Sequence, residues 1–147
     1  MILNGHGFSL RLIMAEGRSA DRFVGHAIIS IGDPELESAS SLRVDFPTAD
    51  LIRLCDWIDQ HLREQARGDS RPARRVWVPA DLSLQLELLD GEIETHANGT
   101  LEGNITVTVF VNLGPTRPSG FSLYQGVQGV VSAKDLLGFR GAVLEAV

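Results

Sequence analysis

Apolar and polar residues alternate along most of the chain, which is the pattern of strands that bury one face. The clearest alternation lies in DLSLQLELLD, where leucines occupy every second position. We expect these leucines, Leu82 to Leu88, to point inward and Ser83, Gln85 and Glu87 to point outward. Comparable alternation predicts strands over residues 7–14, 21–30, 41–46, 92–96, 103–111 and 121–132, and residues 76–80 are expected to form a short extended piece. The last strand is expected to be weakened or bulged by Gly126 and Gly129.

Two segments have the 3.6-residue period of helices instead. A stripe of apolar residues predicts a helix near Thr48–Arg67, with Thr48 as N-cap and Asp50 in the first turn, where the helix dipole favours an anion. A second stripe follows Ser132, which with Asp135 resembles a capping box, and predicts a helix near Ser132–Ala146.

The order of these elements indicates the fold class. Strands precede the first helix, and further strands, two of them joined by a tight turn at Asn98-Gly99, precede the second. Runs of strands joined by hairpins favour an antiparallel sheet over parallel winding. We therefore expect one α+β domain over residues 1–147, with an antiparallel and possibly strongly curved sheet and both helices packed on one face. The connectors 67–75 and 115–120 are expected to be the most mobile internal segments.

Cys55 is the only cysteine of the chain, and it lies within the apolar stripe of the first helix between Leu51 and Ile58. A reactive thiol needs exposure and a lowered pKa, from a helix N-terminus or a nearby cation. A position two turns into the helix on its apolar side supplies neither. We expect Cys55 to be buried and unreactive.

Composition excludes several classes of protein. The formal net charge is -6 and the pI is near 5.1, which argues against a general nucleic-acid binder. The first residues lack the pattern of a signal peptide, and no apolar run reaches the length of a membrane helix. A single cysteine cannot form an internal disulfide, which fits a reducing compartment. These features favour a cytoplasmic protein.

Motifs that carry chemistry are missing. The sequence has no phosphate-binding loop, dinucleotide fingerprint, His-Glu-X-X-His or Cys-X-X-Cys. Glu92, Glu94 and His96 could share one strand face and bind a metal, or they could form a solvated face beside the turn. We take the second interpretation. We expect no catalytic residues, no cofactor, no metal and no enzymatic activity.

Charge is unevenly distributed, because no lysine or arginine occurs from Asp81 to Gly114. The acids of this stretch could bind a basic partner, or they could only keep the protein soluble. The candidate partner-binding residues are Glu87, Glu92, Glu94 and Glu102. Trp77, Phe110 and Tyr124 are candidate anchors if their strand faces point outward, and core residues otherwise.

The layout of the chain resembles the WapI-type immunity family and similar small bacterial domains. The resemblance is carried by a strand run followed by SLRVDFPTADLIRLCDWIDQHL, then VPADLSLQLELLDGEI, a hairpin, and VVSAKDLLGFRGAVLEAV. The chain departs from the family where Val78 precedes Pro79 and where GDPELESAS lacks an Asp-X-Asn-Trp-Leu-like stretch. The resemblance implies a protein that binds and neutralises a cognate toxin, with no catalytic residues to carry over.

Three classes of function therefore stay open. The first is a non-catalytic immunity or inhibitor protein that binds a cognate bacterial toxin, without nucleic acid or membrane as partner. The second is a small-ligand-binding or structural accessory domain. The third is a small enzyme whose site the residue patterns do not reveal. The sequence does not indicate an oligomeric state.

Overall fold

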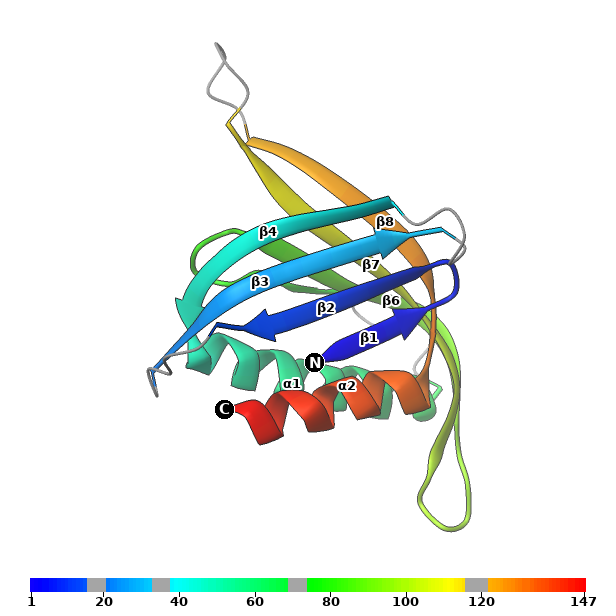
Figure 1. The fold of residues 1–147 in the computed structure, drawn as a ribbon. Coiled ribbons are helices and arrows are strands. Elements are labelled where there is room, and N and C mark those ends of the chain that lie inside the picture. Colours follow the sequence, from blue (N-terminus) through cyan, green and yellow to red (C-terminus); the bar gives the residue numbers. More distant parts are fainter. Residues whose placement is uncertain (16–20, 33–37, 69–73, 116–121) are drawn as a thin grey trace.

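The structure, a computed structural model, describes residues 1–15, 21–32, 38–68, 74–115 and 122–147. Four strands, a long helix, four more strands and a final helix follow one another along the chain (Figure 1). The strands are β1 (Ile2–Gly5), β2 (Phe8–Met14), β3 (Arg22–Ile31), β4 (Ser38–Pro47), β5 (Arg75–Trp77), β6 (Leu84–Thr95), β7 (Leu101–Pro115) and β8 (Ser122–Ser132). The helices are α1 (Thr48–Ala66) and α2 (Ala133–Ala146). The two connectors expected to be mobile lie largely outside the described residues.

The strands form two antiparallel four-stranded sheets, ordered β1-β2-β3-β4 and β5-β6-β7-β8. The α+β class and the antiparallel pairing are confirmed, but the strands divide into two sheets where one was expected. Helix α1 separates β4 from β5 in the chain and leads from the first sheet to the second. Strand β1, which the alternation did not resolve, pairs with β2 from Ile2↔Arg11 to Gly5↔Phe8.

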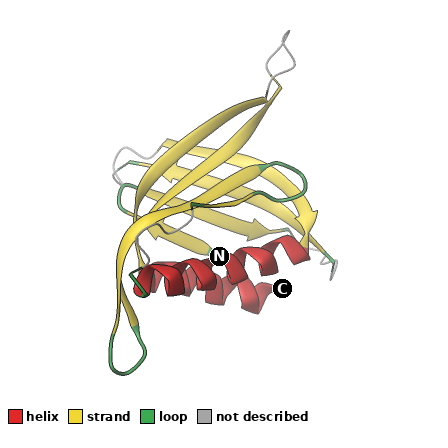
Figure 2. Ribbon diagram, turned by 180° about the vertical axis from the view of Figure 1, so that it is seen from behind, coloured by secondary structure: helices red, strands yellow, loops and turns green. Residues whose placement is uncertain are grey.

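Both helices lie side by side along one side of the two sheets (Figures 1 and 2). Helix α1 contacts β3, β4, β5 and β6, and α2 contacts β1, β7 and β8. Each helix therefore closes the space between the sheets and does not lie on the face of one sheet. Neither described helix combines the length and the apolar composition needed to cross a membrane.

The helix boundaries agree closely with the sequence pattern. Helix α1 begins at Thr48, but Pro47 holds the N-cap position without a side-chain hydrogen bond, so Thr48 is not the cap that was expected. Helix α2 is capped as predicted, because the Ser132 hydroxyl accepts a hydrogen bond from the Asp135 amide at 3.0 Å. This bond satisfies one of the N–H groups that have no partner within a first turn.

A stack of aromatic rings joins the two sheets to α1. Phe23 stacks on Phe46 with ring centroids 5.2 Å apart, and Phe46 meets Trp77 edge to face at 5.9 Å. The Trp77 indole is fully buried and donates to the carbonyl oxygen of Asp50 at 2.7 Å. The buried Asp50 carboxylate accepts from the Ala80 amide at 2.7 Å. Asp50 therefore ties the start of α1 to the chain that enters β6.

Leu82 is exposed, and the prediction that it points into the core is wrong. Its φ is 55° and its amide donates to the Pro79 carbonyl at 3.0 Å, which places it in a turn before β6. The Asp81 carboxylate fixes this turn by accepting from the amides of Ser83 and Asp45. The core alternation of β6 begins only at Leu84.

Strand β8 pairs with β7 without a bulge from Tyr124 to Ser132, so the bulge that its glycines suggested is absent there. A Cβ at Gly126 would come within 2.4 Å of the Phe110 ring. A Cβ at Gly129 would come within 2.7 Å of the Phe8 ring. The two glycines therefore make room for aromatic rings on opposite faces of a regular strand.

Cys55 lies at the contact of the two helices and is 2% exposed, so its predicted burial is confirmed. Its thiol points at the Arg140 carbonyl, with the sulfur 3.7 Å away, and burial raises the thiol pKa from 9.0 to about 11. Beside it, Arg140 of α2 donates to the Asp59 carboxylate of α1 at 2.6 Å. Asp59 therefore links the two helices.

We expect native Cys55 to react slowly with an aromatic disulfide reagent and quickly after denaturation, because the thiol is both buried and protonated. A Cys55→Ser change should lower the free energy of unfolding by about 1–3 kcal/mol, since it buries a hydroxyl in an apolar contact. Thiol titration with and without denaturant checks the first result, and urea unfolding checks the second. Rapid labelling of the native protein would show that the helix contact opens readily.

Candidate functional site

The acidic residues near the turn reach the surface because β6 contains a bulge. Before the bulge the even-numbered residues of β6, such as Leu86 and Leu88, face the core. Between Leu88↔Val107 and Gly91↔Ile105 the strand gains one residue over β7. An extra residue shifts the alternation by one, so each later residue of the strand points to the opposite face of the sheet from the one that the earlier pattern predicts. Ile93 thereby turns inward, and its neighbours in the strand turn outward.

The side of the second sheet that faces away from the core and the helices is called the outer face below. Register places on it Glu92 and Glu94 of β6, the even-numbered residues from Glu102 to Phe110 of β7, and those from Tyr124 to Val130 of β8. Glu92, Glu94 and Glu102 are all exposed. The outer face therefore combines carboxylates at the β6–β7 hairpin with aromatic and amide side chains further along the strands.

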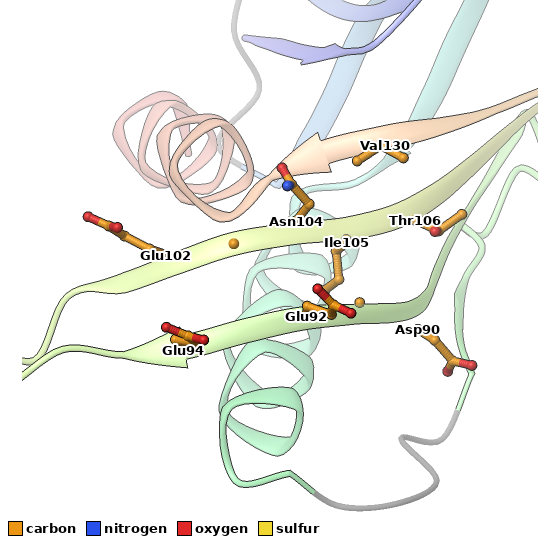
Figure 3. A pocket seen from close by; sticks show the side chains of 10 residues that line it. Asp90, Glu92, Glu94, Glu102, Asn104, Ile105, Thr106 and Val130 are labelled. Atoms are coloured by element: carbon orange, nitrogen blue, oxygen red, sulfur yellow. The ribbon is translucent and has the colours of Figure 1, made fainter.

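A depression of about 390 Å³ lies on this face at the base of the hairpin (Figure 3). Its lining includes the carboxylates of Asp90, Glu92, Glu94 and Glu102 together with Asn104, Thr106 and Val130. Two glycines form its floor, and a Cβ at Gly103 would come within 1.9 Å of the Glu92 carbonyl oxygen. Helix α1 lies behind the strands in this view, so the depression opens away from the helices.

Electrostatic repulsion is built into the hairpin. Glu94 and Glu102 are directly opposite each other across β6 and β7, an arrangement of like charges that destabilises a strand pair. The Nε2 atom of His96 lies 3.0 Å from a carboxylate oxygen of Glu102. A nearby cation would stabilise carboxylates that are held this close together.

Glu87, the fourth candidate, is buried at 4% exposure and is separated from the other three. Its carboxylate accepts hydrogen bonds from the guanidinium of Arg74 and the amide of Gln85. The expectation that Glu87 is an accessible acid is therefore wrong, although its side chain points outward as expected. The alternation places it on the outer face, but a cation distant in sequence covers it.

Cations that the sequence pattern does not reveal lie close to the hairpin. Arg63 and Arg67, at the end of α1, line one depression with Thr95 and Leu101. Lys134, in the first turn of α2, lines another with Glu102. The stretch from Asp81 to Gly114 lacks cations in sequence, yet the hairpin has basic neighbours on the helices. None of these three lines the depression of the outer face.

The three aromatic candidates fall in different places. Trp77 is fully buried and belongs to the core. Tyr124 is 42% exposed, and Phe110 is half-buried with its ring over Gly126. Phe110 and Tyr124 both project from the outer face, and Asn112 donates to the Tyr124 hydroxyl at 3.4 Å. Two of the three therefore remain available as anchors.

His61 of α1 supports the bulge from beneath. Its ring is fully buried, and Nε2 lies 2.8 Å from the carbonyl oxygen of Leu89. Its Nδ1 is buried without a hydrogen-bond partner among the described residues. Burial lowers the pKa of His61 below its usual 6.5, aided by Arg75 and opposed by the Leu89 carbonyl and by Glu64 and Asp90. The neutral ring is therefore hydrogen-bonded to the backbone of Leu89, which lies in the bulge before Glu92 and Glu94.

We expect acid to destabilise the fold through His61. Because the pKa is lowered in the folded state, the unfolded chain binds the proton first as the pH falls through 6.5. The contribution of His61 to the free energy of unfolding should be fully present above pH 6.5. It should decline as the pH falls below 6.5, until the pKa of His61 in the folded state is reached. Urea unfolding between pH 7.5 and 5.5 measures the slope.

His61→Gln should remove most of that slope, while His26→Gln, at an exposed position of β3, should leave it in place. An unchanged slope in the His61 variant would assign the acid sensitivity to other groups.

Within the part of the chain that the structure describes, no group of three histidine, cysteine or acidic side chains is arranged to hold a metal ion. Glu92, Glu94 and His96 are included in that statement.

The family models, the curated proteins and the solved structures with which the chain was compared yield no match.

Proposed function

We propose that this protein acts without catalysis, by binding another protein through the outer face of β6, β7 and β8. The observation that carries the proposal is the coincidence, on one face, of exposed carboxylates with outward aromatic side chains. Glu92 and Glu94 border the depression, and Phe110 and Tyr124 project further along the same sheet.

The two parts of this face suit the two tasks of a protein interface. Aromatic side chains supply most of the binding energy at interface centres, because they bury a large area at a small entropy cost. Charges at the rim act mainly on the rate of encounter and on the choice of partner. A sheet face offers both on a rigid backbone, so little order has to be acquired on binding.

A basic partner is favoured by charge. The protein carries a formal net charge of -6, and the described residues that line the depression include no lysine or arginine. Such a surface would attract a basic protein over distances near the Debye length.

The resemblance of the chain's layout to WapI-type immunity proteins supports one kind of partner. We propose that the protein is an immunity protein that neutralises a cognate bacterial toxin in the cytoplasm. Toxins that act on nucleic acid need basic clefts, so an acidic inhibitor can occupy the surface that the substrate phosphates would use.

Affinity purification of the protein with the product of the adjacent gene tests this function. We expect a stoichiometric complex and loss of toxin activity when the complex forms. Absence of a complex with that product would remove the immunity proposal. A matched comparison with Phe110→Ala and Tyr124→Ala, each expected to weaken the complex, asks whether the outer face makes the contact.

A further inference from the structure

Strand β8 is an edge strand without the protection that edge strands of soluble proteins normally carry. An exposed edge presents unsatisfied N–H and C=O groups, and proteins block it with short strands, charges, proline or a covering element. The two sheets have four edges, formed by β1, β4, β5 and β8. Comparison of these four edges shows which of them is built to accept another strand.

Three of the edges are protected. Strand β1 has four residues and lies against α2, and β5 has three residues. Strand β4 is longer but carries Arg43 and Asp45, and its Asp45 amide donates to the Asp81 carboxylate at 2.9 Å. Each of these edges has a device that discourages pairing with another chain.

Among the described residues, strand β8 has none of these devices between Tyr124 and Gln128. Its 11 residues, SLYQGVQGVVS, include no charged residue and no proline. Tyr124, Gly126 and Gln128 are exposed along its length, as an outermost strand would be. Near its end the edge is occupied, because the His6 amide donates to the Val130 carbonyl at 2.8 Å. The accessible edge is therefore the segment from Tyr124 to Gln128.

The direction of its backbone groups follows from two hydrogen bonds. The Val130 carbonyl points away from β7, toward His6. The Asn112 amide donates to the Ser83 carbonyl and so points away from β8. Asn112 and Tyr124 are therefore opposite each other without exchanging backbone hydrogen bonds, and Tyr124 directs its backbone groups away from β7. In an antiparallel pair both groups of a residue point to the same side and alternate along the strand. Tyr124, Gly126 and Gln128 therefore direct their N–H and C=O groups to the outer edge, where no backbone partner occurs among the described residues.

We propose that this edge pairs antiparallel with the same edge of a second copy of the chain, joining two second sheets into one continuous sheet. The neutrality of β8 favours a second copy as the occupant. Copies with a net charge of -6 repel each other over most of their surface, and β8 is an uncharged contact between them. A strongly charged peptide would find no counter-charge on this strand.

The antiparallel arrangement also keeps the acidic hairpins apart. The β6–β7 hairpin lies at the Ser132 end of β8, because Asn104 pairs with Ser132 and the turn precedes it. In antiparallel pairing the two hairpins lie at opposite ends of the joined sheet, whereas parallel pairing would place them together. The outer faces of both copies stay accessible, so this inference is independent of the proposed function.

Sedimentation equilibrium of the native chain over micromolar concentrations tests the inference. We expect a dimer, with twice the 16.0 kDa mass of one chain. Gln128→Lys should make the protein monomeric, because a charge on an edge strand disfavours pairing with another strand. Gln128→Pro should do the same by removing an edge N–H that the fold does not use. Ser41→Lys, an equal change of charge at an exposed position of the β4 edge, should leave the dimer intact.

Far-UV circular dichroism establishes that each variant is folded, and Gln128→Lys decides the question if the proline variant is not. A native chain that remains monomeric throughout would overturn the inference. A dimer that survives both changes at Gln128 would place the contact elsewhere and would overturn it equally.

Discussion

Replacing Glu92 and Glu94 together by lysine is expected to slow association with a basic partner by about tenfold or more at low ionic strength. Both carboxylates are exposed at the rim of the depression, where a charge acts mainly through long-range attraction. The dissociation rate should change much less. Raising the salt concentration should reduce the difference in association rate between the native protein and the double variant. The reason is that the Debye length falls from about 30 Å at 0.01 M to about 3 Å at 1 M.

A matched control separates the effect of position from that of net charge. Asp56 on α1 and Glu145 on α2 are exposed acids away from the outer face, and their double reversal to lysine changes the net charge equally. Surface plasmon resonance across a salt series measures all three proteins. An equal loss of association rate in the control would mean that only the overall charge matters and would remove the hairpin from the contact.

Trp77→Ala is expected to have the largest effect on stability, lowering the free energy of unfolding by about 3–5 kcal/mol. The indole is fully buried, packs against Phe46 and satisfies the Asp50 carbonyl. Truncation leaves a cavity and an unsatisfied acceptor together. For a domain whose total stability is typically about 5–15 kcal/mol, such a loss would leave a marginal fold.

Trp57→Ala provides the comparison, because Trp57 is the other tryptophan and is only partly buried beside the core. We expect its truncation to cost clearly less. Urea unfolding followed by far-UV circular dichroism compares the two without relying on tryptophan fluorescence. If the Trp57 variant were the less stable one, the aromatic stack would not be the centre of the core.

Local patterns were sufficient to predict most of the secondary structure. The alternation of leucines and valines identified β6 and β7, and the spacing of Leu51, Leu54 and Ile58 identified α1 within a residue or two of its ends. These signals are local consequences of burying one face. Strand β1 was missed because its four residues are too few to establish a period.

The division into two sheets and the position of Glu87 could not be read from local patterns. Strand alternation indicates which face of the sheet a residue occupies, but it does not indicate which side chains of other segments cover it. Arg74, which covers Glu87, precedes the neighbouring strand β5 and reaches Glu87 only after the chain has reversed direction. The same holds for Arg63 and Lys134, which the fold brings close to a hairpin that has no cations of its own. Charge along a sequence therefore predicted the acidic surface only in part.

The outward position of Glu92 and Glu94 was anticipated, although strict alternation from Leu88 would have placed them inside. The bulge before Gly91 accounts for both the inward leucines and the outward glutamates, because after it the odd-numbered Ile93 points inward. A pattern of leucines at even positions followed by an isoleucine at an odd position was the available signal for that bulge. Gly91 supports it, because a Cβ there would come within 2.2 Å of the Asn104 carbonyl oxygen.

Cross-saturation NMR on the complex with the adjacent gene's product tests the central claim most directly, because it reports which amides of this protein lie against the partner. The account predicts intensity losses on the outer face, at Glu92, Glu94, Thr106, Phe110 and Tyr124. Losses confined to the sheet of β1 to β4, or to the exposed sides of the two helices, would contradict the assignment of the outer face as the binding surface.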